Sequence, residues 1–293
     1  MKNNRFIALV LIPAFALLTL FVVIPIFGSF VISMFDYNPL RASNPFLGLA
    51  NYKRAFSGDP VYLLGLRNTI KFVFITVAIN ISLTLVLSQC IAGIKRRFFR
   101  NLTMVAIFLP CVAPIANSAV VWHRSLFPPN RGLFNVVLTA LGGKAIDWIG
   151  SPQFLLYSII LFTVWADIGY NTVLFTAGIE GIPKDFYEAA DIDGAGPLRK
   201  FFTITLPLLG RTFSFVAAMT MISHFQMFAQ FMVFTGRTGG AGNAGRVLTT
   251  YIYFIGFTAK DMGYASAISV TLFLLILVFT MIQQRLNRVD WGY

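Results

Sequence analysis

The sequence predicts an all-α polytopic membrane protein with six transmembrane helices, and two observations carry that prediction. Hydrophobic residues make up 57% of the 293-residue chain, whereas charged residues make up only 12%. A soluble domain of this length would carry about a quarter charged residues, so lipid is the environment that the composition fits. The second observation is a series of apolar stretches that each reach the length needed to cross a bilayer, about 20 helical residues.

Six such stretches follow one another along the chain. They cover approximately residues 7–35, 69–92, 102–123, 153–178, 208–235 and 264–283. The first is too long for the apolar core of a signal peptide, which spans about 7–15 residues, and is expected to be a retained span. The fifth is the least regular, because His224, Gln226 and Gln230 interrupt it. No connection has the pattern of a soluble core, so residues 1–293 are expected to form a single transmembrane domain.

Positive charge orients the predicted spans, because cytoplasmic connections are enriched in Lys and Arg. A tight basic cluster, Lys95, Arg96, Arg97 and Arg100, lies in the second connection. Basic residues also precede the first span and follow the last: Lys2, Arg5, Arg285 and Arg288. The sequence therefore predicts that both termini and residues 180–207 face the cytoplasm. The connections that would face outward are residues 36–68, 124–152 and 236–263.

The cytoplasmic connection 180–207 differs from the others because it is acidic. Five of the eleven Asp and Glu residues of the chain lie in its first half. Pro183 suits a first helical turn, and the acids after it favour the positive end of the helix dipole. Gly194 suits a left-handed cap that ends this helix, and Pro197 can begin a second one. We expect a helix–turn–helix knob with an acidic rim that stands out of the membrane.

The alternative is an ordinary loop helix that lies on lipid headgroups. Such helices are usually basic on their polar face, whereas this one is acidic until Arg199. Anionic lipid would repel it, and Ala189 and Ala190 would let a partner surface approach closely. Docking on a protein partner is therefore the favoured interpretation.

The spacing inside this connection is specific. Glu188-Ala189-Ala190 is followed after three residues by Gly194, and Ile204-x-Leu206-Pro207 follows nine residues after that. This pattern resembles the loop by which permease subunits of ABC importers dock on their ATPase.

Motifs in the same order along the whole chain look like those of the maltose-type carbohydrate permease subunits of ABC importers. They are Leu109-Pro110, Gly132-Leu133-Phe134-Asn135, Gly169-Tyr170, Ile182-Pro183, Tyr187-Glu188-Ala189-Ala190, Asp193-Gly194-Ala195, Thr235…Gly239-Gly240 and Gly263-Tyr264-Ala265-Ser266-Ala267. The resemblance implies a type I importer permease in a bacterial inner membrane, moving oligosaccharides that a solute-binding protein delivers.

The resemblance also implies roles and partners. The coupling helix in a cleft of the nucleotide-binding subunit would comprise Tyr187, Glu188, Ala189, Ala190, Asp191, Asp193 and Gly194. Expected partners are a second, non-identical permease, two ATPase subunits, a solute-binding protein and membrane lipid, with no nucleic acid. The chain lacks a GxxxxGK[ST] phosphate loop, so ATP and Mg²⁺ are expected on the ATPase. No catalytic residue, cofactor or metal site is expected in this chain.

Asp167 is the residue that most strongly suggests a substrate path, because it lies midway through the fourth span. An acid near the bilayer centre is costly and marks a functional site by default. Tyr170 and Asn171 follow at i+3 and i+4, on the same helix face. The alternative is a helix-packing hydrogen bond from Asp167 to the partner subunit.

The fifth span offers a second set of candidates, Phe225, Gln226, Phe228 and Gln230. Amides interleaved with rings suit a sugar path, since amides bind hydroxyls and rings cover the C–H faces of a sugar. The same residues could instead pack helices through interhelical amide bonds. Both interpretations stay open at this point.

The outward connections carry more Lys and Arg than Asp and Glu. This excess would attract an acidic surface of a binding protein, or an anionic oligosaccharide such as a uronate polymer fragment. Anchoring of some arginines at headgroups is the simpler explanation for part of it. Two rival functions remain: an ion-coupled secondary transporter that uses Asp167, and an ABC importer for another polar solute.

Overall fold

The computed structural model describes residues 2–286 of the chain. These residues form helices and no β-strand beyond an isolated bridge between Phe35 and Phe46, which confirms the all-α prediction. The chain divides into two compact units, Met1–Leu63 with Leu248–Leu275, and Leu64–Val247 with Ile276–Tyr293. The predicted position of the two termini also concerns Met1 and residues 287–293, which lie outside the described residues.

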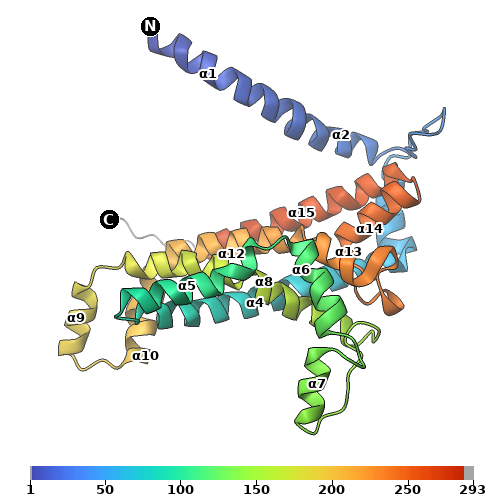
Figure 1. The fold of residues 1–293 in the computed structure, drawn as a ribbon. Helices are drawn as coiled ribbons and strands as arrows, with labels where there is room; N and C mark the ends of the chain where they lie inside the picture. The colour runs from blue at the N-terminus through green and yellow to red at the C-terminus, as the bar shows by residue number, and fades with distance from the viewer. Residues whose placement is uncertain (1, 287–293) are drawn as a thin grey trace. The chain divides into compact units, whose positions relative to one another are not determined.

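The first unit begins with a long apolar helical rod. It consists of α1 (Lys2–Leu18), a π-helical turn (Thr19–Val23) and α2 (Ile24–Ile32), which run on without a break (Figure 1). Its segment Leu11–Ile32 has a mean hydropathy of 2.6, and none of its side chains is buried. Apolar side chains exposed all around a helix of this length are typical of a membrane span.

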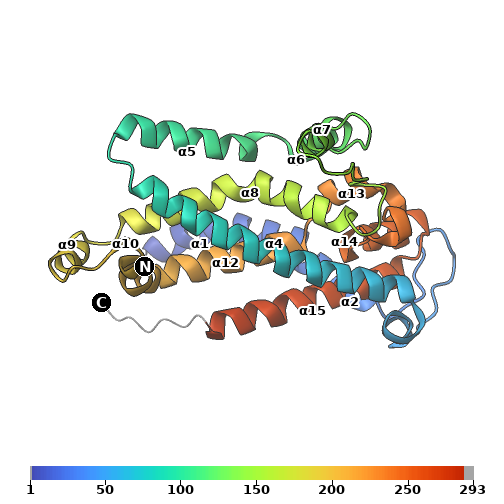
Figure 2. The same ribbon diagram turned by 90° about the horizontal axis from the view of Figure 1, so that it is seen from below.

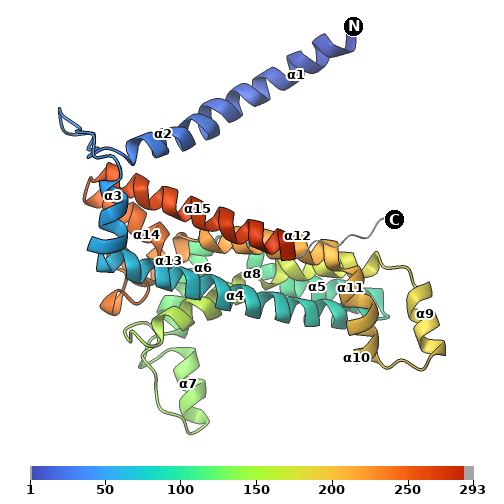
Figure 3. The same cartoon turned by 180° about the vertical axis from the view of Figure 1, so that it is seen from behind.

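The rest of the first unit consists of short helices around the start of α15 (Figure 3). They are α3 (Ala50–Lys53), a π-helical turn (Arg54–Gly58), α14 (Leu248–Tyr253) and a second π-helical turn (Phe254–Thr258). α15 (Met262–Leu286) follows, and its residues from Ile276 on belong to the second unit. Asn51 fixes α3 to the end of α2, because its Nδ2 donates to the carbonyl oxygens of Ser33 at 2.9 Å and Phe35 at 3.0 Å. These bonds satisfy carbonyls that the end of a helix leaves unpaired.

Asp59 organises the polar core of this unit. Its Oδ1 accepts from the amides of Val61 (2.9 Å) and Tyr62 (3.0 Å) at the start of α4 (Pro60–Ala92). Its Oδ2 accepts from the hydroxyls of Tyr251 and Tyr264. Burial alone would raise the pKa of the Asp59 carboxyl, but these four hydrogen bonds outweigh burial and hold its pKa below the usual value.

The second unit is built on four long helices, α4, α5 (Arg97–Val112), α8 (Leu155–Glu180) and α12 (Gly210–Phe225). α8 is the most buried of the candidate spans, with 61% of its apolar window inside the protein. Three shorter helices complete the unit at one end of it, α6 (Ile115–Val121), α7 (Leu133–Ala140) and α13 (Ala229–Thr235) (Figure 2).

The described residues contain four helices that can each span a membrane, and six candidate crossings if each of two bent helix pairs counts as one. Leu11–Ile32, Pro60–Ala92, Leu155–Glu180 and Met262–Leu286 are single helices long and apolar enough to span. Arg97–Val112 with Ile115–Leu126 and Pro197–Leu208 with Gly210–Phe225 bend by 92° and 73°, so each pair completes one crossing only in a bent form.

The bounds of the crossings differ from the predicted ones for local reasons. The helix predicted at 69–92 begins at Pro60, where proline suits a first turn. The third crossing bends at Ala113 and Pro114, because proline cannot continue the helical hydrogen-bond ladder. Residues 208–235 form α12 and α13, separated at Gln226, Met227 and Phe228.

α5 and α8 approach each other closely at Gly169. A side-chain Cβ at this position would lie 2.5 Å from the carbonyl oxygen of Ile107 and 2.6 Å from Cα of Phe108. Both are backbone atoms, so the contact cannot be relieved by a rotamer change. The absence of a side chain at Gly169 is therefore what lets these two helices pack backbone to backbone, as small residues do between membrane helices.

Candidate functional site

The acidic connection forms the helical knob that its sequence predicts. It consists of α9 (Asp185–Ile192), α10 (Pro197–Lys200), a π-helical turn (Phe201–Thr205) and α11 (Leu206–Leu208). Gly194 has φ of +68°, a conformation that favours glycine. The amide of Ala195 donates to the carbonyl oxygen of Ala190 at 2.9 Å, and this bond closes the end of α9.

The two legs of the knob are tied to each other. The hydroxyls of Tyr187 and Thr205 are hydrogen-bonded at 2.9 Å, and Lys200 forms an ion pair with Asp191. Tyr187 and Asp191, predicted as coupling residues, therefore hold the knob together, while Glu188, Ala189, Asp193 and Gly194 are exposed and Ala190 is half-buried.

The knob also exposes large apolar side chains that the sequence analysis did not single out. Ile192 is 88% exposed and Leu198 is 76% exposed. Ile192 stands between Asp191 and Asp193 in the sequence, and an apolar residue between two acids is the signal that could have identified it; Phe186 and Phe202 are exposed in the same connection. An apolar pair within an acidic rim is typical of a surface that a protein partner covers.

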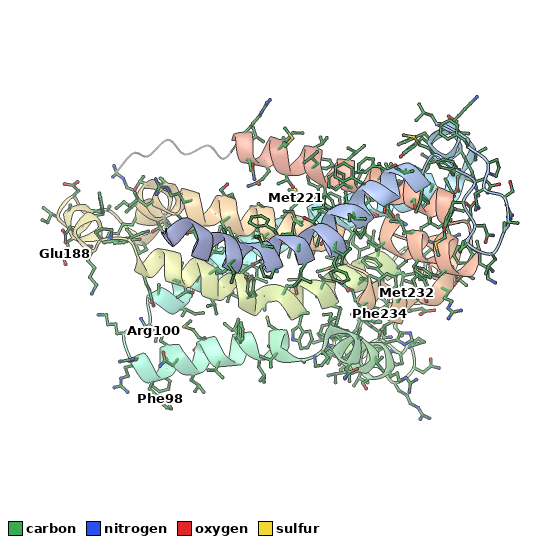
Figure 4. The ribbon with its side chains drawn as sticks, turned by 90° about the horizontal axis from the view of Figure 1, so that it is seen from above. Phe98, Arg100, Glu188, Met221, Met232 and Phe234 are labelled. Atoms are coloured by element: carbon green, nitrogen blue, oxygen red, sulfur yellow. The ribbon has the colours of Figure 1, made fainter. Side chains whose placement is uncertain are left out.

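An ion pair brings the basic connection and the knob to the same end of the second unit. Nη1 of Arg100, at the start of α5, lies 2.8 Å from Oε1 of Glu180, at the end of α8. Figure 4 shows Arg100, Phe98 and Glu188 at this end, with α7 at the opposite one. The last described turns of α15 reach the same end, since Gln283 Nε2 donates to the carbonyl oxygen of Ser214 at 3.1 Å.

A cavity of about 670 Å³ lies in the middle of the second unit. Its walls come from the bend between α5 and α6, from α8, and from α12 with the break that follows it. Predicted path residues that line it are Asp167, Tyr170, Asn171, Gln226, Phe228 and Gln230. The structure thus gathers two predicted sets, from the fourth and the fifth spans, around one space.

Phe225 is the predicted path residue that lies outside the cavity lining. It is 1% exposed and stacks on Phe279 of α15, with ring centroids 5.8 Å apart. Its neighbours in sequence, Gln226 and Phe228, reach the cavity because α12 ends at Phe225 and the chain changes direction. Phe225 therefore packs α12 against α15.

Asn171 borders the cavity, but its amide is used in helix packing. Its Nδ2 donates to Oδ1 of Asn80 on α4 at 2.6 Å and to Oγ1 of Thr220 on α12 at 2.9 Å. A single side chain thus joins three helices by buried hydrogen bonds. These bonds lie within the chain, and a role of Asn171 in the substrate path stays a prediction.

Asp167 faces His224, which the sequence analysis noted only as an interruption of the fifth span. Oδ2 of Asp167 lies 3.7 Å from Nε2 of His224. Nδ1 of His224 lies 2.7 Å from the carbonyl oxygen of Thr220, and because a carbonyl only accepts, Nδ1 must carry the proton. In the neutral ring Nε2 is then an acceptor, and it has no hydrogen-bond partner among residues 2–286.

Gln230 lines the cavity, but its amide nitrogen is buried. Its side chain is 3% exposed, and its Nε2 has no hydrogen-bond partner in the part of the chain that the structure describes. A buried polar atom without a partner is costly, so it is expected to be satisfied by water or by a ligand. The cavity wall therefore presents the partly exposed carboxylate of Asp167 and the amide of Gln226 beside the rings of Tyr170 and Phe228, while the nitrogens of Gln230 and His224 are buried.

Not every outward cation is available to a partner. Arg246 is 5% exposed, and its guanidinium donates to the carbonyl oxygen of Arg237 at 2.9 Å and to Oδ1 of Asn243 at 3.1 Å. Arg54 lies over the ring of Tyr264 and is paired with Asp261 at 2.7 Å. Both arginines, counted among the outward charges from the sequence, serve to hold loops in place.

Comparison with known proteins places these features in a family. The family model of the binding-protein-dependent transport system inner membrane component matches residues 81–289. The chain is 34% identical to a probable ABC transporter permease protein, YurN, of Bacillus subtilis, over 97% of each chain. It is 31% identical to the trehalose/maltose transport system permease protein MalF of Thermococcus litoralis, over 96% of this chain and 92% of the relative.

A solved structure shows the same fold. One chain of a bacterial alginate ABC transporter, crystallised with an alginate pentasaccharide-bound periplasmic protein, superposes with a TM-score of 0.86. The match covers 98% of this chain and 95% of that one, at 19% identity. The resemblance and the type I permease architecture inferred from the sequence are thereby confirmed. The chain belongs to the family of binding-protein-dependent transport system inner membrane components, the permease subunits of ABC transporters.

Proposed function

We propose that the chain is the permease subunit of an ABC importer for oligosaccharides. We further propose that the transported oligosaccharide occupies the cavity as it crosses the membrane. As a member of its family it is a pore component and not an enzyme. The observation that carries the substrate proposal is the cavity of about 670 Å³ whose wall combines polar side chains, Asp167 and Gln226, with the aromatic rings of Tyr170 and Phe228. Hydroxyl groups both donate and accept, so a sugar matches this mixture.

Names of relatives support the same class of substrate. Besides the trehalose/maltose permease, similar chains are named for arabinooligosaccharides in Bacillus subtilis and for lactose in Rhizobium radiobacter. A further relative, from Yersinia pseudotuberculosis, is named for sn-glycerol-3-phosphate. An anionic polar solute is therefore the competing substrate class within the same transport mechanism.

An acidic oligosaccharide is a second candidate within the proposed class. Exposed basic residues of the outward connections support it, among them Arg41, Lys53, Arg124 and Arg237. Such residues could equally attract an acidic binding protein.

The knob is the proposed site of coupling. Glu188, with the exposed Ile192 and Leu198, would enter a cleft on an ATPase subunit whose rim is basic and whose floor is apolar. Closure of two ATPases on ATP and Mg²⁺ would drive this chain and a second, non-identical permease between inward- and outward-facing states. The solute-binding protein would dock on the outward connections.

The same geometry supports an orientation in the membrane. The knob and the basic cluster Lys95–Arg97 lie at one end of the second unit, and Arg100 joins them through Glu180. Basic connections favour the cytoplasm, and an ATPase works there. We infer that this end is cytoplasmic, and that α7 and residues 236–247 are on the outer side.

Uptake in a deletion strain tests the function. Cells that lack this chain would be complemented with wild type or with Glu188→Lys, and assayed with maltotriose, trigalacturonate and glycerol 3-phosphate. Loss of uptake of at least one oligosaccharide, restored by wild type alone, supports the proposal. Loss of glycerol 3-phosphate uptake alone, or of none of the three, contradicts the oligosaccharide assignment.

A further inference from the structure

The cavity wall holds a carboxylate and an imidazole side by side, and the charge of this pair affects which substrates the cavity can accept. Asp167 on α8 and His224 on α12 face each other across its wall, with Oδ2 and Nε2 3.7 Å apart. Nδ1 of His224 is committed to the carbonyl oxygen of Thr220 at 2.7 Å. With no proton between the two groups the pair is anionic, and with one shared proton it is neutral.

Apart from a proton on the Asp167–His224 pair itself, the described cavity wall holds no positive charge. Among the described residues that line it there is neither Lys nor Arg, and the groups around the pair are Cys111, Tyr170, Asn171, Ser223 and Gln226. Sγ of Cys111 donates to the carbonyl oxygen of Ala166 at 3.0 Å, and Asn171 is used between helices. None of these groups can neutralise a carboxylate or a phosphate.

An anionic substrate would therefore lose hydration in this cavity without an opposite charge from this chain. Burying a charge without a partner is strongly unfavourable, and proximity to Asp167 adds repulsion. A neutral polyol faces no such penalty. Its hydroxyls can donate to the Asp167 carboxylate, whose side chain is 33% exposed, and can bond to the exposed amide of Gln226 in the same wall.

We propose that Asp167 and His224 make the cavity of this chain selective for neutral oligosaccharides and adverse to anionic ones, phosphate esters and uronates included. The inference rests on the proposed function and names its substrate class. It assigns the basic outward connections to contact with an acidic binding protein, because they lie outside the cavity lining.

Binding to the intact transport complex tests the proposal without interference from the selectivity of the binding protein. The complex in lipid nanodiscs, without its binding protein, would be titrated with radiolabelled maltotriose and trigalacturonate, two trisaccharides that differ in charge. Wild type is expected to bind maltotriose saturably and to bind trigalacturonate at least 10-fold more weakly. The control Asp36→Asn removes an exposed carboxylate that is paired with Arg41 outside the cavity, and is expected to match wild type.

Two variants change the charge of the cavity at little structural risk. Asp167→Asn keeps the shape of the side chain and removes the carboxylate, and Gln226→Lys adds a cation at an exposed position of the cavity wall. Each is expected to raise the affinity for trigalacturonate relative to maltotriose by about 10-fold or more. Because Gln226 is exposed, Gln226→Lys remains informative if Asp167→Asn does not assemble.

Distinct results would overturn the inference and the proposed function. Wild-type affinity for trigalacturonate equal to or above that for maltotriose, or an unchanged ratio in Gln226→Lys, refutes the selectivity while oligosaccharide import stands. Binding of neither trisaccharide by a complex that imports oligosaccharides in cells refutes the cavity as the site of selection. Absence of oligosaccharide uptake in cells refutes the proposed function, and the inference with it.

Discussion

Nδ2 of Asn171 lies 2.6 Å from Oδ1 of Asn80, and through this bond α8 is fixed to α4 at the edge of the cavity. The same nitrogen donates to Oγ1 of Thr220 at 2.9 Å, so α12 is held as well. Asn171, one helical turn after Asp167 on α8, therefore positions the part of the cavity wall that carries Asp167.

Replacing Asn171 tests this positioning role. Asn171→Ala leaves Asn80 and Thr220 without their donor and is expected to lower the stability of the complex by about 1–2 kcal/mol, in the range of polar contacts between membrane helices. Thermal unfolding in detergent measures this change. Neutral and acidic sugars should be affected alike, because the amide does not discriminate charge. A selective loss for one sugar class would show that Asn171 contacts substrate.

Gly194 and Gly196 form a matched pair for testing the knob. Gly194 has φ of +68° and Gly196 has φ of −69°, and neither would bring a new Cβ within 4 Å of another group. Gly194→Ala is expected to strain the left-handed cap by about 1–2 kcal/mol, whereas Gly196→Ala should be neutral. ATPase activity stimulated by the loaded binding protein is the readout. Equal activities of the two variants would contradict a role for the shape of the turn in coupling.

The apolar part of the docking surface can be tested separately from its charge. Ile192→Ser removes a side chain that is 88% exposed and is expected to weaken association with the ATPase by roughly 10-fold, since burial of such a side chain contributes about 1.5–3 kcal/mol. Co-purification of the ATPase and a binding titration measure the loss. Val136→Ser, on α7 at the opposite end, is an exposed apolar control and should leave ATPase binding unchanged.

Helix packing at Gly169 gives a prediction about stability. Gly169→Ala would place a Cβ 2.5 Å from a backbone oxygen of α5 and is expected to destabilise by about 1–3 kcal/mol, as overpacking does. Gly181→Ala, at the end of the same helix, meets its nearest atom at 3.4 Å and should be tolerated. Thermal unfolding of both variants tests the difference. Equal stability would show that α5 and α8 can separate freely.

The hydrogen bonds to the Asp59 carboxylate should make the stability of the protein depend on pH. The pKa of the Asp59 carboxyl is lowered in the folded protein because hydrogen bonds outweigh burial. Ionised Asp59 therefore stabilises the folded state in full at pH values above the ordinary carboxyl pKa, about 3.9. That contribution is lost as the pH falls through the lowered, folded value. Unfolding measured between about pH 6 and pH 3 should show a steeper loss of stability for wild type than for Asp59→Asn. Parallel curves would contradict the role of Asp59.

The sequence predicted well those features that depend on composition or on backbone chemistry. Low charge and long apolar stretches predicted the all-α membrane fold, and the positive φ of Gly194 follows from the need to end α9 within a short connection. The spacing around Glu188 identified the family before any comparison. The roles of individual residues in coupling and in the cavity remain predictions.

Features that depend on three-dimensional packing were not predictable from the sequence. The cavity exists because the third crossing bends at Pro114 and α12 stops at Phe225, and neither event follows from apolar length alone. His224 could not be paired with Asp167, which lies 57 residues earlier in the chain on another helix. Arg246 belongs by sequence to the basic residues of an outward connection, and its burial is a second such feature, because buried arginines are unusual.

The source of energy for uptake tests the central claim most directly. Proteoliposomes that contain the full complex and its binding protein would be loaded with ATP and Mg²⁺, and oligosaccharide uptake would be measured with and without an ionophore that collapses ion gradients. An ABC importer coupled through Glu188 predicts uptake that requires internal ATP, persists with the ionophore and is lost in Glu188→Lys. Uptake that needs no ATP and stops with the ionophore would instead show an ion-coupled transporter, and would contradict the account.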